Sequence, residues 1–317
     1  MKDARMLNLL VEGLRDAVPA IEWRGSARES DQAIRGMIEK LGGRVCISRR
    51  KHFGWLLSHT PAAEPSVLIE MNTGLAGPMR FVMASTGERV RVQATWPWGW
   101  PVDALVRCLA SDVLCLLGDG ETGFVRSAAL AGDVQDWLRD LAAVHGRVTD
   151  VPTSGPGFEF ISKHGASALQ IYAWQPRPGL LSLNTLVTNW VADKRANRAV
   201  SKIMLMLNRR LRWVRLTRRG TAIEAQATLP TVALNDETWK QARHALNQAV
   251  QACREVLRSA QLPAVALAFD QMHGGPRQRG TAPGISAHGA SATGLVPQSR
   301  DRRSELAKAD CNNRQIR

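Results

Sequence analysis

Residues 79–97 read MRFVMASTGERVRVQATWP, and residues 211–230 read LRWVRLTRRGTAIEAQATLP. Both stretches carry Arg-aromatic-Val near the start, a glycine in the middle and Gln-Ala-Thr-x-Pro at the end, and they differ in length by one loop residue. Two matched blocks in the same order indicate an internal repeat, in which one structural unit occurs twice along the chain.

Each stretch has the pattern of a β-hairpin. In the first stretch, apolar residues alternate on either side of a glycine-containing turn: Met79, Phe81, Met83, Val90 and Val92. The second stretch repeats the pattern with Leu211, Trp213, Ile223 and Ala225, although Arg215 interrupts it. Such alternation is typical of two antiparallel strands with one buried face.

An amphipathic helix is expected after each hairpin. In the second copy Asn235 is a favourable N-cap, and Asp236 and Glu237 suit the positive end of the helix dipole. Its apolar stripe is Trp239, Ala242, Leu246, Ala249, Val250, Cys253 and Leu257. The stripe of the first copy is Val102, Leu105, Leu109, Val113 and Leu116, between Pro101 and Gly118.

The upstream segments complete two units of similar layout. We expect helices at about 29–42, 66–72, 129–144 and 193–208, and strands near 45–47, 53–57, 158–161 and 169–174. A short amphipathic helix is expected near the N-terminus, around residues 6–11. Each unit then has the order α-β-β-α-β-β-α, which predicts an α+β fold with a twisted antiparallel sheet and packed helices.

The sequence predicts three parts. Residues 1–125 hold the first repeat and residues 126–271 the second. From residue 272 to 317, Gly, Ser, Pro, Ala and Arg dominate without periodicity, so a disordered basic tail is expected.

Composition favours a folded protein of the cytoplasm. The 317 residues are 44% hydrophobic and 22% charged, which suits a globular chain. The five cysteines (Cys46, Cys108, Cys115, Cys253 and Cys311) are scattered and form no CxxC, so we expect reduced, mostly buried thiols. No apolar run approaches the roughly 20 residues of a membrane-spanning helix.

The second copy, roughly residues 155–269, resembles the YbjN and type III secretion chaperone-like superfamily. The resemblance lies in residues 199–229, where a helix ends in Leu207-Asn208 and the hairpin turns at Gly220, and in the amphipathic helix from Asp236. It implies a twisted antiparallel sheet with helices, commonly in a homodimer, and no catalytic residues. The family's secretion members bind unfolded segments of effector proteins. A tandem repeat is then expected to imitate the family's dimer within one chain.

The sequence contains no recognisable catalytic or cofactor motif, so we expect no enzyme, no cofactor and no metal site. The stretch Gly118-Asp-Gly-Glu-Thr-Gly123 fits GxGxxG, but it follows a helix, whereas the dinucleotide motif follows a strand and opens a helix. The seven histidines show no metal-ligand spacing.

Two tryptophans are candidates for partner binding. Trp98 and Trp100 lie in the Pro- and Gly-containing loop Trp96-Pro-Trp-Gly-Trp-Pro101, which has no counterpart in the second copy. Exposed tryptophans often anchor partners because they offer large contact area at low entropic cost. Packing of the two rings against the neighbouring repeat is the alternative.

A basic segment supplies a different candidate. The net charge is +14, which favours acidic partners. Cations concentrate between residues 194 and 219: Arg195, Arg198, Lys202, Arg209, Arg210, Arg212, Arg218 and Arg219. Clustered cations suit phosphate backbones, and a solvated helix face is the alternative.

The function most consistent with the sequence is a non-catalytic adaptor or chaperone-like protein that recognises a polypeptide partner. The alternative is sequence-tolerant nucleic-acid binding through residues 194–219 and the tail.

Overall fold

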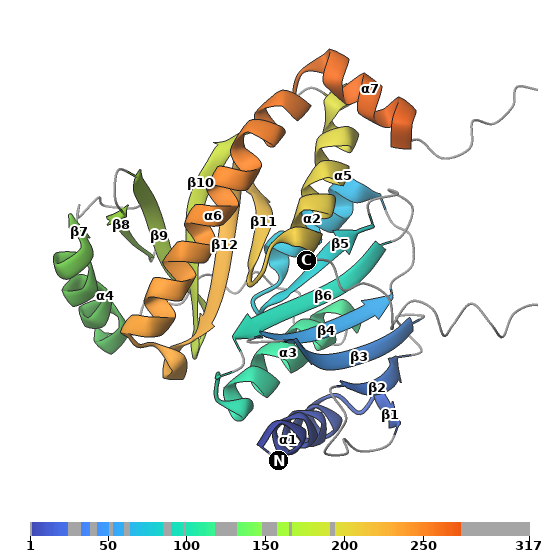
Figure 1. The fold of residues 1–317 in the computed structure, drawn as a ribbon, viewed down its shortest axis with the longest axis vertical. Helices are drawn as coiled ribbons and strands as arrows, with labels where there is room; N and C mark the ends of the chain where they lie inside the picture. The colour runs from blue at the N-terminus through green and yellow to red at the C-terminus, as the bar shows by residue number, and fades with distance from the viewer. Residues whose placement is uncertain are drawn as a thin grey trace, which may run out of the picture. The chain divides into compact units, whose positions relative to one another are not determined.

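The computed structural model describes residues 2–24, 33–38, 43–50, 53–59, 64–84, 90–97, 99–117, 132–147, 157–164, 167–190 and 194–273. These residues form two antiparallel sheets of six strands each, with helices packed on them (Figure 1). The fold class is therefore α+β with two tandem units, as the sequence predicts. All the described residues belong to one compact body, residues 1–275, which contains both tandem units.

The first unit opens with helix α1 (Lys2–Ala17) and contains a sheet of strand order β1-β2-β3-β4-β6-β5. The strands are β1 (Glu22–Arg24), β2 (Ala33–Ile38), β3 (Gly43–Arg50), β4 (Phe53–His59), β5 (Met79–Met83) and β6 (Val90–Pro97). Helix α2 (Pro65–Gly74) lies between β4 and β5, and α3 (Val102–Leu117) follows β6.

The second unit repeats this order element by element. Helix α4 (Gly132–His145) opens it, and its strands follow the order β7-β8-β9-β10-β12-β11. The strands are β7 (Gly146–Arg147), β8 (Gly157–His164), β9 (Ser167–Arg177), β10 (Leu180–Asn189), β11 (Val214–Arg219) and β12 (Ala222–Pro230). Helix α5 (Lys194–Arg210) lies between β10 and β11, and α6 (Asp236–Ala260) and α7 (Pro263–His273) follow β12.

The predicted order α-β-β-α-β-β-α is wrong, because each unit has four strands rather than two before its central helix. One predicted helix is also wrong. The helix expected at about 29–42 is absent at residues 33–38, which form strand β2. The apolar residues Ala33, Ile34, Met37 and Ile38 suit a strand as well as a helix, and Gly36 disfavours the helix. Pairing decides the outcome, because β2 is hydrogen-bonded to β1 on one side and to β3 on the other.

The predicted C-terminal tail falls mostly outside the described residues. Its first residues, Met272 and His273, belong to α7. Residues 274–317 lie outside the described part of the chain.

Strand register corrects the alignment of the two hairpins. Arg80 faces Gln93 across the first hairpin, and Arg215 faces Gln226 across the second. Arg80 therefore corresponds to Arg215, the residue that interrupts the apolar alternation, and not to Arg212. Trp213 lies outside β11 because its backbone has a φ of 63°, in the left-handed region that ends a strand.

A buried asparagine at the end of each central helix fixes the strand that follows. The Asn72 side chain donates to the Phe81 carbonyl at 3.3 Å and accepts from the Phe81 N–H at 2.6 Å. Asn208 makes the same pair of bonds with Leu216, at 3.2 and 2.6 Å. Both units thus use one device to connect helix to edge strand.

The two corresponding arginines each bind the other unit across the interface between the units, which we call the join. Arg80, in the first unit, donates to the carbonyl oxygens of Asn208 and Leu211 at the end of α5. Arg215, in the second unit, donates to the carbonyl oxygens of Leu75, Gly77 and Met79, just after α2. Each guanidinium therefore satisfies carbonyl oxygens of the other unit at the end of its central helix or between that helix and the next strand.

Helices cover the two sheet edges at this join in the same reciprocal way. Helix α2 of the first unit packs on β11, and α5 of the second unit packs on β5. The Thr73 hydroxyl donates to the Arg218 carbonyl at 3.0 Å and accepts from the Arg218 N–H at 3.2 Å. Covered in this way, neither edge strand offers its unpaired backbone to another chain.

The charges at the join are almost fully buried. Arg80 is 1% exposed and Arg215 is 3% exposed. Burial lowers the pKa of Arg80 to about 9 and that of Arg215 to about 10, and both values leave the guanidinium charged at neutral pH. Asp112 of α3 is the buried carboxylate whose charge stabilises Arg215, although burial raises its own pKa.

Replacing Arg215 by Met should lower the free energy of unfolding by about 3–5 kcal/mol, because it leaves Asp112 without its counter-charge and several carbonyls without donors. Chemical denaturation followed by tryptophan fluorescence measures the change. Arg209→Met, at an exposed position on α5, is the matched control and should shift stability by no more than about 0.5 kcal/mol. Equal effects of the two substitutions would contradict the role given to Arg215.

Candidate functional site: a groove along α6

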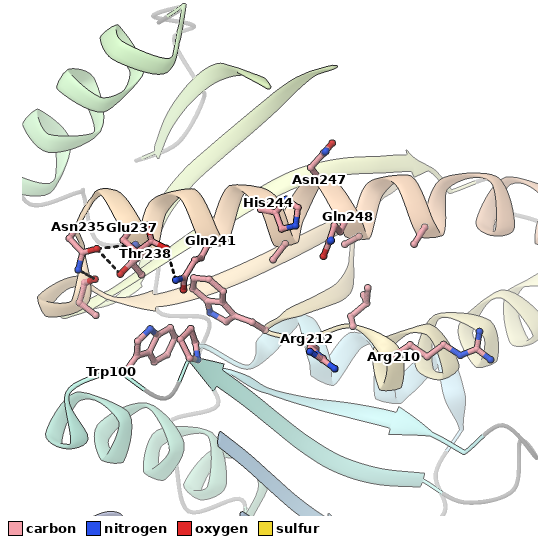
Figure 2. A pocket seen from close by; sticks show the side chains of 18 of the residues that line it. Trp100, Arg210, Arg212, Asn235, Glu237, Thr238, Gln241, His244, Asn247 and Gln248 are labelled. Carbon is pink, nitrogen blue, oxygen red and sulfur yellow. Dashed lines mark hydrogen bonds between the residues drawn. The ribbon is translucent and has the colours of Figure 1, made fainter. Parts of the chain in front are cut away.

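A groove of about 1560 Å³ runs between α6 and residues that lie where the two units meet. One wall is α6 from Asn235 to Ala252, and the other contains Trp100 of the first unit and residues 210–213 of the second. Figure 2 shows α6 on one side, with Trp100 and Arg210 toward opposite ends of the other. The groove therefore contains residues of both units.

Two tryptophan rings form the apolar floor. Trp100 and Trp213 meet edge to face, with ring centroids 5.6 Å apart and an interplanar angle of 76°. The Trp213 indole N–H donates to the Thr228 carbonyl at 2.9 Å, whereas the Trp100 indole nitrogen has no hydrogen-bond partner among the described residues.

The structure describes one of the two predicted anchor tryptophans. Trp100 is only 4% exposed and packs on Trp213 of the neighbouring repeat, which is the alternative left open for it. It lines the groove as part of the floor rather than as a projecting side chain. Trp98 lies outside the described residues.

The α6 wall is polar and mostly uncharged. The residues that line it include Gln241, His244, Gln248 and Gln251, all exposed. Glu237 accepts a hydrogen bond from Gln241 at 2.8 Å near the start of the helix. Asn235 accepts from the Thr238 N–H at 2.9 Å, so the expected N-cap is confirmed. Asn247 points away from Trp100 (Figure 2).

Among the described residues, the cations of the basic segment do not share one exposed face. Lys202 is buried, because α5 is covered by β5 and α2 of the first unit as well as by α6 and α7. Arg198 is exposed and pairs with Glu64 at 3.7 Å. The side chain of Arg195 lies outside the described part of the chain.

The remaining arginines fall into two groups at opposite ends of β11. Arg210 and Arg212 line the groove, and Arg209 is exposed beside them on α5. Arg218 lies over the Trp190 ring at 4.2 Å, and Arg219 lies near Trp174 at 5.3 Å. Only the first group can act on a ligand in the groove.

Among the described residues, the first unit closes the place that corresponds to the groove. Three residues before Arg80 stands Gly77, and three residues before Arg215 stands Arg212. The Gly77 N–H donates to Asp112 at 2.8 Å, and the Met79 N–H donates to the same carboxylate at 2.9 Å. Helix α3 therefore sits directly on the turn after α2.

Glycine is required for this contact. A Cβ at Gly77 would lie 2.6 Å from the carbonyl oxygen of Cys108 and 2.5 Å from the Asp112 carboxylate. Arg212 brings a long side chain to the corresponding place in the second unit, so α6 cannot approach its turn as α3 does. The groove is the space left between α6 and the turn after α5.

The described residues offer no other recognisable reactive site. The described cysteines, Cys46, Cys108, Cys115 and Cys253, form no disulfide, and burial raises the pKa of Cys108 to about 12 and that of Cys253 to about 11. Within these ranges no group of three or more His, Cys, Asp or Glu side chains could hold a metal ion. The GxGxxG stretch from Gly118 lies outside them. None of the described helices is long and apolar enough to cross a membrane.

No protein-family model matches the chain, and comparison with curated proteins finds no match. The resemblance to the YbjN and type III secretion chaperone-like superfamily therefore stays a prediction.

Replacing Gly77 by Ala should lower the free energy of unfolding by about 1–3 kcal/mol, because the added methyl group meets the backbone of α3. Gly74→Ala is the matched control: a Cβ there meets no atom within 4 Å, and it lies in the last turn of α2. Alanine at that helical position should leave stability unchanged or raise it by up to about 1 kcal/mol. Thermal unfolding of both variants checks the difference, and a stable Gly77→Ala protein would contradict the close packing of α3.

Proposed function

We propose that this protein is a non-catalytic adaptor or chaperone-like protein that binds a polypeptide segment in the groove along α6. The observation that carries the proposal is the groove's size together with its lining. Its volume of about 1560 Å³ exceeds the roughly 300–1,000 Å³ of ordinary small-molecule pockets.

The lining suits a polypeptide backbone. Glutamine side chains each offer a carbonyl oxygen and two N–H donors, the same groups that a peptide main chain needs as partners. Gln241, Gln248 and Gln251 present such groups along one wall, opposite the floor of Trp100 and Trp213. An aromatic floor opposite a wall of amide side chains supports non-catalytic binding of a polypeptide.

The groove also has the length of a short extended segment. The lining run of α6 from Asn235 to Ala252 spans about 25 Å at about 1.5 Å per residue. An extended chain covers that distance in about eight residues at about 3.3 Å each. We therefore expect a ligand segment of about this length.

Nucleic-acid binding through residues 194–219 is the weaker proposal. Lys202 is buried and Arg198 is paired with Glu64, so fewer cations remain for phosphates than the sequence suggests.

The join between the units also supports a proposal about assembly. The reciprocal contacts of Arg80 and Arg215, and of α5 and α2, are those expected when two copies of one unit pack about a two-fold axis. We infer that the single chain takes the place of a homodimer. We also propose a cytoplasmic location, as the sequence predicts.

A display library of random 12-residue peptides, selected on the immobilised full-length protein, tests the groove. Synthetic copies of the enriched peptides should bind with affinities that Gln248→Trp lowers by at least about tenfold, because the indole fills the groove. Val256→Trp, at an exposed α6 position outside the groove lining, should change affinity less than about twofold.

Two results would contradict the proposal. One is a selection in which no peptide is enriched. The other is binding of a single-stranded 20-nucleotide DNA that weakens steeply with salt and is lost in Arg209→Gln with Arg210→Gln, while no peptide binds; that result would favour the phosphate-binding alternative.

A further inference from the structure

In the first unit, helix α3 and its side chains fill the place that corresponds to the groove. Aligning the units at Pro97 and Pro230 without gaps places Leu109 opposite Ala242 and Val113 opposite Leu246. All four of these side chains are buried in the core, so the core-facing sides of α3 and α6 correspond.

The same alignment places Asp112 of α3 opposite Ala245 of α6. Asp112 binds the turn after α2 through two backbone N–H groups and also stabilises Arg215. Ala245 lines the groove and has no polar group with which to do the same for the turn after α5. In the second unit the carboxylate is missing and the space in front of the turn is open.

The charges around this opening are positive. Arg210 and Arg212 line the same part of the groove and are exposed, while Glu237 lies toward the Trp100 end (Figure 2). A ligand carboxylate placed before the 210–214 turn would therefore face cations, whereas one placed at the other end would face Glu237. The net charge of +14 favours an acidic ligand over the whole molecule as well.

We propose that the groove binds an acidic polypeptide segment. One Asp or Glu carboxylate of this segment contacts the turn after α5 (residues 210–214) in the way that the Asp112 carboxylate contacts the turn after α2. This inference rests on the proposed function, because it specifies the chemistry of the segment that the groove takes. The acidic side chain lies at the Arg210 end of the segment, and apolar side chains lie over Trp100 and Trp213.

The test gives the protein its own carboxylate. Ala245→Asp recreates the Asp112 position on α6 and should compete with the ligand, so the affinity of an enriched acidic peptide should fall at least about tenfold, the range of a hydrogen bond to a charged group. Val256→Asp adds the same charge to the same helix at an exposed position outside the groove lining, and affinity should change less than about threefold.

The probes are the 12-residue peptides enriched on the full-length wild-type protein and, for each, a variant with Asp and Glu replaced by Asn and Gln. The acidic forms should bind the wild-type protein at least about tenfold better than the amide forms. Replacing Arg210 and Arg212 by Gln should remove most of that preference, and circular dichroism verifies that each variant is folded.

Each other outcome overturns the inference in a distinguishable way. If peptides are enriched but the amide forms bind equally well, polypeptide binding stands and the acidic specificity is wrong. If Ala245→Asp and Val256→Asp weaken binding equally, general charge repulsion explains the effect and the Asp112-like position is wrong. If no peptide is enriched, the proposed function fails together with the inference.

Discussion

The join between the two units depends on two guanidinium groups that are buried and reach past one another. Arg80 and Arg215 each leave their own sheet to satisfy carbonyl oxygens at a helix end of the other unit. A buried charge is tolerated only when hydrogen bonds or counter-charges replace the lost water, so this arrangement admits one relative placement of the two units. Thr95 extends it, because its hydroxyl accepts from Arg80 and from the Trp213 N–H. The floor of the groove is thereby tied to the join.

Much of the fold could be predicted from local pattern. The hairpins, the helix α6 with its cap at Asn235, and the repeat itself depend on residues close in sequence, and alternation and helical spacing report them well. The segment 33–38 shows the limit of that reasoning. Its apolar residues fit two periods, and hydrogen bonding to β1 and β3, which no local pattern contains, selects the strand.

The candidate site was less accessible to sequence reasoning. Arg215 looks like an interruption of a strand, and its role is visible only when Leu75 and Gly77, more than a hundred residues earlier, are seen beside it. Trp100 looks like an exposed anchor until Trp213 is placed against its ring. The one available signal was the repeat, since Gly77 and Arg212 occupy corresponding places with opposite demands on space. That signal required the correct register, and matching Arg80 to Arg212 concealed it.

The pair Gly77 and Arg212 has a consequence for how such a molecule is encoded. In an assembly of two identical chains, every codon is read into both partners, so one position cannot be glycine on one side of the axis and arginine on the other. Tandem duplication gives each side its own codon and lets the two diverge. Here one side has kept a closed, self-satisfied turn, and the other has been left open. Among its described residues the single chain thus has one open groove at a position where an assembly of identical chains would have either two or none.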